Sequence, residues 1–223
     1  MLLRVLDIIF SLIGIVIITP IMLPVVIALL LTGEHHVFYL QERVGRNGSI
    51  FRVVKFATML KNSPSLPGGY ITQDRDPRVL PLGHFLRKTK INELPQLLNV
   101  LIGKMSLVGP RPQVREHLNL YSENERNKIL RIKPGLTGIG SLIFRDEEGI
   151  LNMMEGDRKF NHNQIISPYK ARLENWYYEN RNTKYYFLLI IYTVILVVNP
   201  KIILPLKVFH GLPSIPQELE RYL

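Results

Sequence analysis

The N-terminal segment is a long apolar stretch, in which the 24 residues from Ile8 to Leu31 carry no charge. Its length exceeds the roughly 18 apolar residues that indicate a membrane helix. It is also too long for the core of a signal peptide, and no cleavage site of small residues follows it. The pattern therefore predicts a retained membrane anchor over residues 1–33.

Helix-breaking residues lie near the middle of this stretch, where Thr19 precedes Pro20. Proline lacks a backbone N–H, and the threonine hydroxyl can donate to the Ile15 carbonyl and promote a bend. Two geometries are open: a kinked helix that spans the bilayer, and two arms that dip in and return to the same face. Each arm would be about 18 Å long, too short for a core of about 30 Å, and the pattern alone favours the spanning helix. Both place the middle of the chain on the cytoplasmic side.

The middle of the chain, residues 34–184, mixes strand, helix and loop patterns. Two short apolar runs, Val37–Leu40 and Ile50–Val54, flank the dipeptide Asn47-Gly48. This dipeptide readily adopts the positive φ angles of a tight turn, so we expect a β-hairpin. Helical spacing prevails elsewhere, and we therefore expect a mixed α/β fold that is mostly helical.

The C-terminal part, residues 185–223, opens with a second apolar run of 14 uncharged residues, Tyr185–Val198. That length is more typical of a core helix or an interfacial helix than of a spanning one. Tryptophan and tyrosine residues precede it, and both are types that settle at the membrane–water boundary. A helix lying in the interface and a packed core helix both remain open.

Composition narrows the chemistry. The chain has no cysteine, which excludes disulfide frameworks, thiolate metal sites and cysteine nucleophiles. Its formal net charge is +10, with 28 Lys and Arg against 18 Asp and Glu. Such a balance indicates a polyanionic partner: nucleic acid, anionic lipid or a phosphorylated substrate. No nucleic-acid-binding motif accompanies the charge.

Two segments suit phosphate chemistry. If Pro95 is the first residue of the helix that ends at Gly103, then Asn92 and Glu93 lie just before a helix N-terminus, where unpaired N–H groups favour phosphate and metal. Proline on both sides of Arg111 would present its guanidinium at low entropic cost, as phosphate binding requires. A structural turn with an ion-paired arginine explains the second segment equally well.

A set of short motifs occurs in order along the chain. They are Gln41-Glu42-Arg43-Val44-Gly45, Lys55-Phe56, Asp76-Pro77-Arg78, Leu86-Arg87-Lys88-Thr89, Glu93-Leu94-Pro95-Gln96-Leu97, Asn99-Val100, Met105 to Pro112 and Lys133 to Gly138. Together they resemble the bacterial sugar transferase family, the monotopic phosphoglycosyl transferases, over most of residues 1–140.

The resemblance implies an activity and a location. Enzymes of this family transfer a phospho-sugar from a UDP-sugar to a polyprenyl phosphate such as undecaprenyl phosphate, release UMP and need Mg²⁺. They lie on the cytoplasmic face of the bacterial inner membrane and begin surface glycan or glycoconjugate assembly. Their N-terminal helix is re-entrant and broken at a Ser/Thr-Pro element, which here is Thr19-Pro20 and reverses the preference for a spanning helix. Residues 34–184 are then the catalytic domain, with interfacial helices.

The resemblance also implies a site, with one departure. The family carries an Asp-Glu pair whose Asp is the nucleophile and whose Glu helps to hold Mg²⁺; here Asn92 replaces the Asp and Glu93 remains. A neutral amide cannot attack phosphorus as a carboxylate does. Three readings follow: another route such as direct attack by the lipid phosphate, an inactive homologue, or an engineered substitution. The residues expected to bind substrate phosphates are Lys55, Arg75, Arg78, Arg87, Pro110, Arg111 and Pro112.

Other residues could take the roles of nucleophile and metal ligand, and two other functions remain open. Asp74 or Asp76 would replace the missing nucleophile, and Asp146 or Asp157 would replace Glu93 as the metal ligand. The rivals are an inactive membrane-bound homologue that binds UDP-sugar or scaffolds glycan assembly, and a membrane-tethered nucleic-acid binder. The expected partners are a UDP-sugar, polyprenyl phosphate and the lipid bilayer, without nucleic acid and with a homo-oligomer left open.

Overall fold

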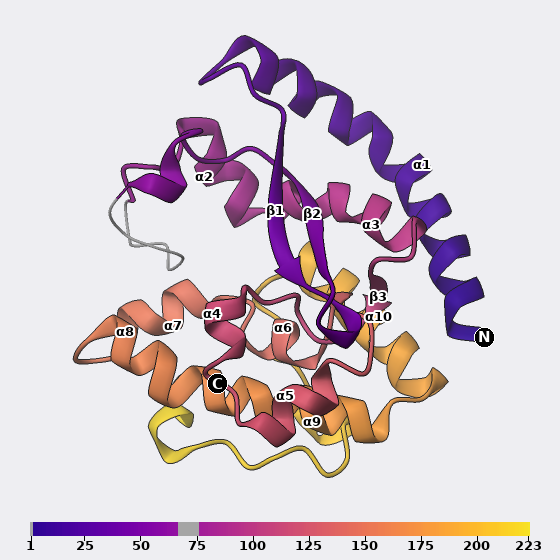
Figure 1. Cartoon of the computed structure of the whole chain (residues 1–223), viewed down its shortest axis with the longest axis vertical. Coiled ribbons are helices and arrows are strands. Elements are labelled where there is room, and N and C mark those ends of the chain that lie inside the picture. The colour runs from indigo at the N-terminus through magenta and orange to yellow at the C-terminus, as the bar shows by residue number, and fades with distance from the viewer. Residues whose placement is uncertain (1, 67–75) are drawn as a thin grey trace. The chain divides into compact units, whose positions relative to one another are not determined.

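The computed structural model of the chain describes residues 2–66 and 76–223. Its fold is mixed α/β and mostly helical, as the sequence predicts (Figure 1). The helices are α1 (Leu2–Leu31), α2 (Pro81–Lys88), α3 (Leu97–Leu101), α4 (Arg115–Leu118), α5 (Glu123–Ile129), α6 (Ile139–Ile143), α7 (Glu147–Met153), α8 (Arg158–Phe160), α9 (Ser167–Asn180) and α10 (Thr183–Val198). The strands are β1 (Phe38–Val44), β2 (Ile50–Phe56), β3 (Ser106–Val108) and β4 (Gly135–Thr137).

Two compact units divide the chain. Unit 1 comprises Met1–Glu42 and Arg52–Gly103, and unit 2 comprises Arg43–Phe51 and Lys104–Leu223. Both units also contain short helical segments of other types. The 3-10 helices are η1 (Arg46–Gly48), η2 (Ser63–Ser65), η3 (Ile91–Gln96), η5 (Leu206–Val208) and η6 (Gln217–Leu219), and η4 (Asn161–Ile166) is a π-helix.

Helix α1 is continuous over 30 residues, with Pro20 and Pro24 inside it. The Thr19 hydroxyl donates to the Ile15 carbonyl at 2.6 Å, as the sequence predicts. The expected break at Thr19-Pro20 is nevertheless absent, because a proline removes one backbone hydrogen bond and a helix can accommodate its ring by bending. In the described part of the chain, α1 is the one helix that is long and apolar enough to cross a membrane.

The core of unit 1 is built around Leu29, Phe56 and Leu86, which come from α1, β2 and α2. Partly buried apolar side chains surround these three: Met22, Val25, Val26, Val37, Leu82 and Ile91. The C-terminal half of α1 therefore packs on the unit that carries β2 and α2. Other α1 side chains, such as Val16 and Ile17, stay exposed, which leaves an apolar surface on this helix.

The predicted hairpin is present, with β1 and β2 paired. Its turn uses positive φ angles at both Asn47 and Gly48, 57° and 74°, for the reason the dipeptide suggests. The side chain of Asn99 in α3 forms hydrogen bonds with the backbone of β2. Its Oδ1 accepts from the Val54 N–H at 2.9 Å, and its Nδ2 donates to the Arg52 carbonyl at 2.8 Å. This buried amide thereby satisfies backbone groups of β2.

Unit 2 contains a second, parallel pair of strands, in which β3 lies beside β4 with Ser106 opposite Gly135 and Val108 opposite Thr137. Its hydrophobic core includes Val44, Leu118, Tyr121, Ile129 and Ala171, contributed by β1, α4, α5, α9 and the segment after α4.

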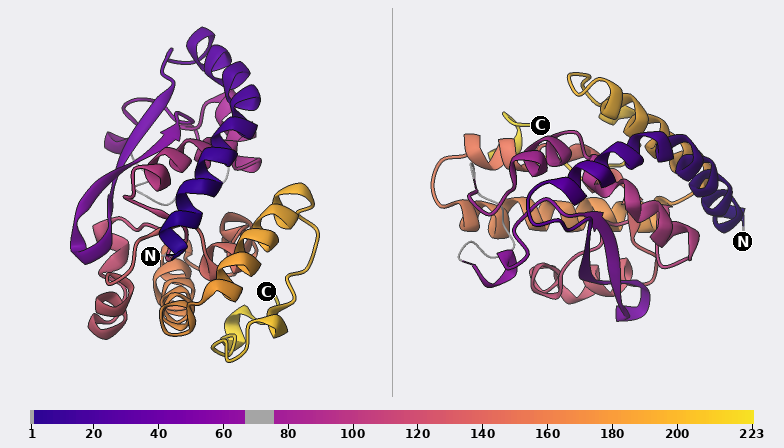
Figure 2. Two further views of the ribbon diagram at one scale, coloured as in Figure 1. Left: turned by 90° about the vertical axis from the view of Figure 1, so that its right-hand side faces the viewer. Right: turned by 90° about the horizontal axis from the view of Figure 1, so that it is seen from above.

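The C-terminal apolar run forms α10, and the chain then folds back along α9 and α10 (Figure 2). Phe209 is buried in this tail, with its ring 6.0 Å from that of Trp176. The Trp176 indole donates to the His210 carbonyl at 3.0 Å. Aromatic packing and a partly buried hydrogen bond therefore hold the tail against α9 and α10.

Candidate active site

Asn92 and Glu93 lie in η3, which leads directly into α3. Lys90 precedes the turn in a left-handed conformation with φ 62°, and its carbonyl accepts from the Glu93 N–H at 3.0 Å. Pro95 lies inside η3 rather than at the first position of the α-helix. The 3-10 helix η3 therefore determines the backbone positions of Asn92 and Glu93, which do not lie immediately before the first residue of α3.

Asn92 is a buried polar residue, with 8% of its surface exposed. Its Oδ1 is buried and has no hydrogen-bond partner among the described residues. An unpaired buried amide oxygen costs free energy and calls for an explanation, such as a bound ion. In the described part of the chain, no three His, Asp or Glu residues gather to hold a metal by themselves.

Glu93 faces Lys55 of β2. The Lys55 Nζ lies 3.7 Å from the Glu93 Oε1, and each side chain is 16% exposed. From the sequence, Lys55 was expected to bind phosphate and Glu93 to hold the metal, and the fold of unit 1 brings the two side chains together. A partly buried amine beside a carboxylate can attract a phosphate while the carboxylate attracts a cation.

Asp76 and Arg78 form a buried ion pair in unit 1. The Arg78 Nε donates to the Asp76 Oδ1 at 2.9 Å, and the Arg78 Nη2 donates to Oδ2 at 2.6 Å. The hydrogen bonds from this guanidinium to Asp76 raise the pKa of Arg78. Arg78 is 4% exposed and Asp76 is 3% exposed, so this pair is held inside the unit with its fork on the carboxylate.

The other expected cations of this segment are less well defined. Arg87 lies near the end of α2, half-buried, with its Nη1 4.0 Å from the Met59 sulfur. Arg75 and Asp74 lie outside the described residues.

Arg111 is presented by a rigid platform in unit 2. The Gly109 N–H donates to the Thr137 carbonyl at 2.9 Å, and the Gly135 N–H donates to the Pro110 carbonyl at 2.8 Å, which extends the β3–β4 ladder to the Pro110-Arg111-Pro112 segment. A Cβ on Gly135 would lie 2.1 Å from the Gly109 nitrogen, so this approach requires glycine.

A buried carboxyl lies under this platform. The Arg111 N–H reaches the Glu174 Oε1 at a long 3.5 Å, and Glu174 is 3% exposed. Burial raises the pKa of Glu174 to about 7. Its Oε2 has no hydrogen-bond partner in the described chain. Sequence reasoning missed Glu174, because a single Glu in an aromatic helix gives no local signal.

A further set of titratable side chains lies buried or partly buried in unit 2. Glu147 accepts from the Lys170 Nζ at 2.8 Å and lies 3.4 Å from the His162 Nε2. The Lys170 charge helps to lower the pKa of Glu147 against the opposing effect of burial. The ring of His117 lies 4.8 Å from that of His162, and burial lowers the pKa of His117 to about 4.

The fallback metal ligands have local roles. Asp146 caps α7 by accepting from the Gly149 N–H at 3.1 Å. Asp157 caps α8 by accepting from the Phe160 N–H at 2.7 Å. Both carboxylates therefore serve helix N-termini.

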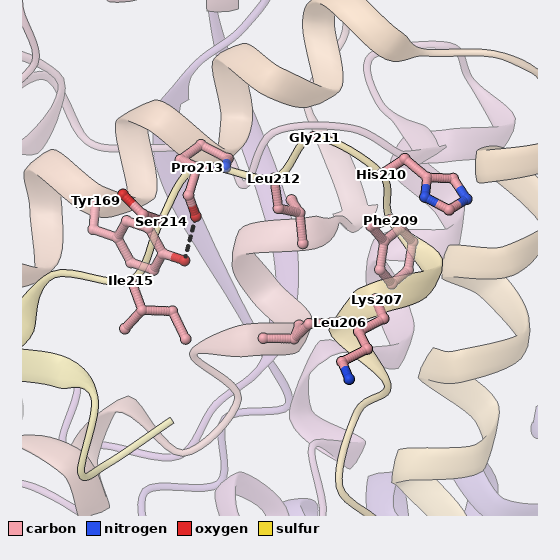
Figure 3. Close-up of a pocket in the computed structure, with 10 residues that line it drawn as sticks. All are labelled: Tyr169, Leu206, Lys207, Phe209, His210, Gly211, Leu212, Pro213, Ser214 and Ile215. Carbon is pink, nitrogen blue, oxygen red and sulfur yellow. Dashed lines mark hydrogen bonds between the residues drawn. The ribbon is translucent and has the colours of Figure 1, made fainter.

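A shallow cavity of about 400 Å³ lies elsewhere in unit 2, under the C-terminal tail. Figure 3 shows Tyr169 at one side of it, with its hydroxyl donating to the Pro213 carbonyl at 3.2 Å. Its lining contains no carboxylate, and its basic side chains are those of Lys207 and His210. It is remote in sequence from the predicted site residues and gathers none of them.

Comparison with known proteins identifies the family. A family model described as bacterial sugar transferase matches residues 1–200. The chain belongs to the bacterial sugar transferase family. The match includes Lys55, Glu93 and Arg111, so the motifs that suggested a sugar transferase lie inside the family region.

Curated bacterial proteins are similar to this chain over about two thirds of its length. An uncharacterized sugar transferase of Haemophilus influenzae is 39% identical over 150 residues, 61% of this chain and 31% of the relative. The exopolysaccharide production protein ExoY of Sinorhizobium fredii is 36% identical over 63% of this chain and 68% of the relative. The UDP-glucose:undecaprenyl-phosphate glucose-1-phosphate transferase of Escherichia coli is 36% identical over 67% of this chain and 32% of the relative. The chain thus spans about a third of the first and third of these proteins.

Proposed function

We propose that this chain transfers a sugar phosphate from a UDP-sugar to polyprenyl phosphate, undecaprenyl phosphate in particular, and releases UMP. The reaction would begin the assembly of a bacterial surface glycan or glycoconjugate. The observation that carries the proposal is the family match over residues 1–200. Relatives support it by name: one acts as an undecaprenyl-phosphate galactose phosphotransferase in Salmonella typhimurium, and another transfers glucose 1-phosphate from UDP-glucose in Escherichia coli.

The membrane arrangement is part of the proposal. Residues 1–33 would be a re-entrant anchor in the inner membrane, with the catalytic domain, residues 34–184, on the cytoplasmic face. Contacts within unit 1 support it: Arg4, near the start of α1, donates to α3, and Leu29, near the end of α1, packs on Phe56 and Leu86. Packing of both ends of α1 on one unit supports an arrangement in which both ends lie on the same side of the bilayer.

Residues 185–223 would add an interfacial element through α10. One face of this helix exposes Phe187, Ile191, Val194 and Val198, at spacings of three and four residues. The opposite face is buried. A helix with an apolar outward face suits the boundary between lipid and water.

Mg²⁺ is the proposed cofactor, and the residues of η3 fit it. Glu93 supplies a carboxylate, and the buried Oδ1 of Asn92 is an oxygen acceptor with no hydrogen-bond partner in the described chain. Magnesium is usually held by one or two protein oxygens together with substrate phosphate. When bound, it would neutralise charge on the phosphate oxygens as the bond to UMP breaks.

Cationic side chains would bind the phosphates. The position of Lys55, 3.7 Å from Glu93, supports this role for it, as does the position of Arg111 between two prolines in unit 2. Arg75 and Arg87 are further candidates, whereas Arg78 would act by ordering the segment that its pair with Asp76 holds. Arginine suits phosphate because its planar fork can donate two parallel hydrogen bonds.

The amide at Asn92 favours a reaction route without a covalent enzyme intermediate. An amide oxygen does not form the covalent phospho-sugar intermediate that a carboxylate can form. In the direct route, an oxygen of the lipid phosphate attacks the sugar-bearing phosphorus, the bond from that phosphorus to the bridging oxygen breaks, and UMP leaves with the electron pair. The Asn92 amide would then orient phosphate or metal. Asn92 also supports a second candidate function, an inactive homologue that binds UDP-sugar.

Release of UMP tests the proposal. The full chain in polyprenyl-phosphate vesicles would be incubated with a panel of UDP-sugars and Mg²⁺. UMP release that needs both the lipid phosphate and one of the sugars supports the transferase. Tight binding of a UDP-sugar with no UMP release would support the inactive homologue instead.

A further inference from the structure

Arg4 makes an unusual contact for the first basic residue of a membrane anchor. Its Nη1 donates to the Val100 carbonyl at 2.6 Å, and its Nη2 donates to the Leu101 carbonyl at 2.8 Å. These carbonyls belong to the last two residues of α3. The Val100 carbonyl also accepts from the Gly103 N–H at 2.9 Å. The carbonyls at a helix C-terminus carry partial negative charge, so a guanidinium there adds charge-assisted hydrogen bonds and stabilises the end of α3.

The rest of the same face of α1 also packs inward. Asp7 and Ser11 are buried, and they follow Arg4 at helical spacing. Gly14 continues this face: a Cβ there would lie 3.1 Å from the Cδ1 of Leu97, the first residue of α3. Contacts at Arg4 and Gly14 therefore hold α1 against both ends of α3. The two helices lie next to each other in Figure 1.

Helix α3 is joined in turn to both halves of the candidate site of unit 1. It continues without a gap from η3, which carries Glu93. Asn99 in its middle bonds to the backbone of Val54, next to Lys55 in β2. The 3.7 Å approach of Lys55 to Glu93 therefore depends on how α3 lies against β2.

We propose that Arg4 is a positioning residue for Glu93. By capping α3, its guanidinium fixes the η3–α3 segment against β2 and keeps the Glu93 carboxylate facing Lys55. The membrane helix is thereby coupled to the carboxylate. The activity readout of this inference rests on the proposed function, but its structural readout does not.

The usual role of such a residue is different. A basic residue at the end of a membrane helix commonly binds anionic lipid headgroups. Arg4 is the one Lys or Arg among the first 42 residues, and both of its terminal nitrogens donate to α3 carbonyls. These carbonyls take the place of a lipid phosphate, which makes α3 rather than the lipid its partner.

The experiment compares Arg4→Gln and Arg4→Lys with the wild type in vesicles, with Val5→Ala as the matched control. Val5 is exposed on α1 and has no part in the site. Hydrogen–deuterium exchange would follow the amides of residues 91–103 and of Val54, whose N–H is bonded to Asn99. Turnover, KM for the UDP-sugar and the Mg²⁺ concentration for half-maximal activity would be measured alongside.

Arg4→Gln should speed exchange at these amides, lower kcat and raise the Mg²⁺ requirement, each by roughly tenfold, with KM for the UDP-sugar changed less than about twofold. Arg4→Lys should recover part of each effect, since one ammonium can still donate to one carbonyl. Val5→Ala should match the wild type. Unchanged exchange in Arg4→Gln together with weaker vesicle binding would overturn the inference and make Arg4 a lipid ligand.

The experiment also tests the role of Arg4 if the wild type is inactive or if Arg4→Gln does not fold. If the wild type shows no turnover, the proposed function fails, and exchange at Val54 and residues 91–103 still decides whether Arg4 holds α3. If Arg4→Gln does not fold, Arg4→Lys carries the test. Wild-type exchange, turnover and Mg²⁺ requirement in a folded Arg4→Lys variant would contradict a role for the two-pronged cap.

Discussion

The ammonium group of Lys55 lies 3.7 Å from the carboxylate of Glu93, in a place where both side chains are only 16% exposed. One residue comes from a strand and the other from a 3-10 turn, 38 positions later in the sequence. Partial burial limits screening by water and salt, so each charge affects its surroundings more than a surface charge would. A cation and an anion can therefore both be attracted to this part of unit 1.

Replacing Glu93 by Gln should remove most Mg²⁺-dependent turnover, by more than about 100-fold, because a neutral amide is a weak ligand for a hard dication. The measurement is UMP release across a Mg²⁺ titration. Glu42→Gln is the control, since Glu42 is 65% exposed in a surface pair with Arg52. Near-normal activity and metal dependence in Glu93→Gln would place the metal elsewhere.

Replacing Asn92 by Asp should raise UMP release, because a carboxylate at this position can attack phosphorus. The two side chains are almost equal in size, so the turn of η3 should accept the change. With polyprenyl phosphate withheld, mass spectrometry should find a phospho-sugar adduct on residue 92 of the variant and none on the wild type. A variant with neither gain nor adduct, beside an active wild type, would leave direct displacement or a different nucleophile, Asp74 or Asp76, as the account.

Glu174 should make stability fall as pH rises. The folded chain keeps this proton up to about pH 7, whereas the unfolded chain loses it near the ordinary pKa of 4.5. The folded state thus binds the extra proton between these values, and stability decreases with pH across that range. Glu174→Gln, which stays neutral, should gain roughly 1–3 kcal/mol over the wild type at pH 8 and little near pH 4.

Urea unfolding at a series of pH values measures this difference. Glu179→Gln serves as the control, because Glu179 pairs with Lys128 at an exposed position. A gain for Glu174→Gln that did not vary with pH would show that the carboxyl is not held protonated by burial.

A re-entrant anchor places Leu2 on the cytoplasmic side. Since the chain has no cysteine, Leu2→Cys would carry the one thiol of the variant. A membrane-impermeant maleimide should fail to label it in intact cells and should label it after lysis. Efficient labelling from outside would show that α1 spans the membrane.

Local patterns predicted the elements that depend on local chemistry. Asn47-Gly48 predicted the hairpin because both residues readily adopt positive φ angles, which they have in the loop between β1 and β2. The hydrogen bond from the Thr19 hydroxyl was also predicted, because it depends only on residues one turn apart in the helix. The break predicted at Pro20 was not found, because helix continuity also depends on how α1 packs on the rest of unit 1.

Long-range partners could not be predicted from spacing. Asn99 bonds to Val54, and Arg4 bonds to Leu101, across 45 and 97 positions of the sequence. The motif Asn99-Val100 contributed to the family resemblance, yet its physical role in fastening β2 needs the fold. Glu174 likewise acquires its raised pKa from burial that a single sequence does not reveal.

The most direct test of the account follows the phosphorus. The full chain in polyprenyl-phosphate vesicles would receive Mg²⁺ and a UDP-sugar labelled at the phosphorus that bears the sugar. The account predicts that this label moves into the lipid fraction together with the sugar, in step with UMP release, and that it stays in solution with Glu93→Gln. Label that remains in solution with every UDP-sugar, or sugar that reaches the lipid without the labelled phosphorus, would contradict a sugar-phosphate transferase.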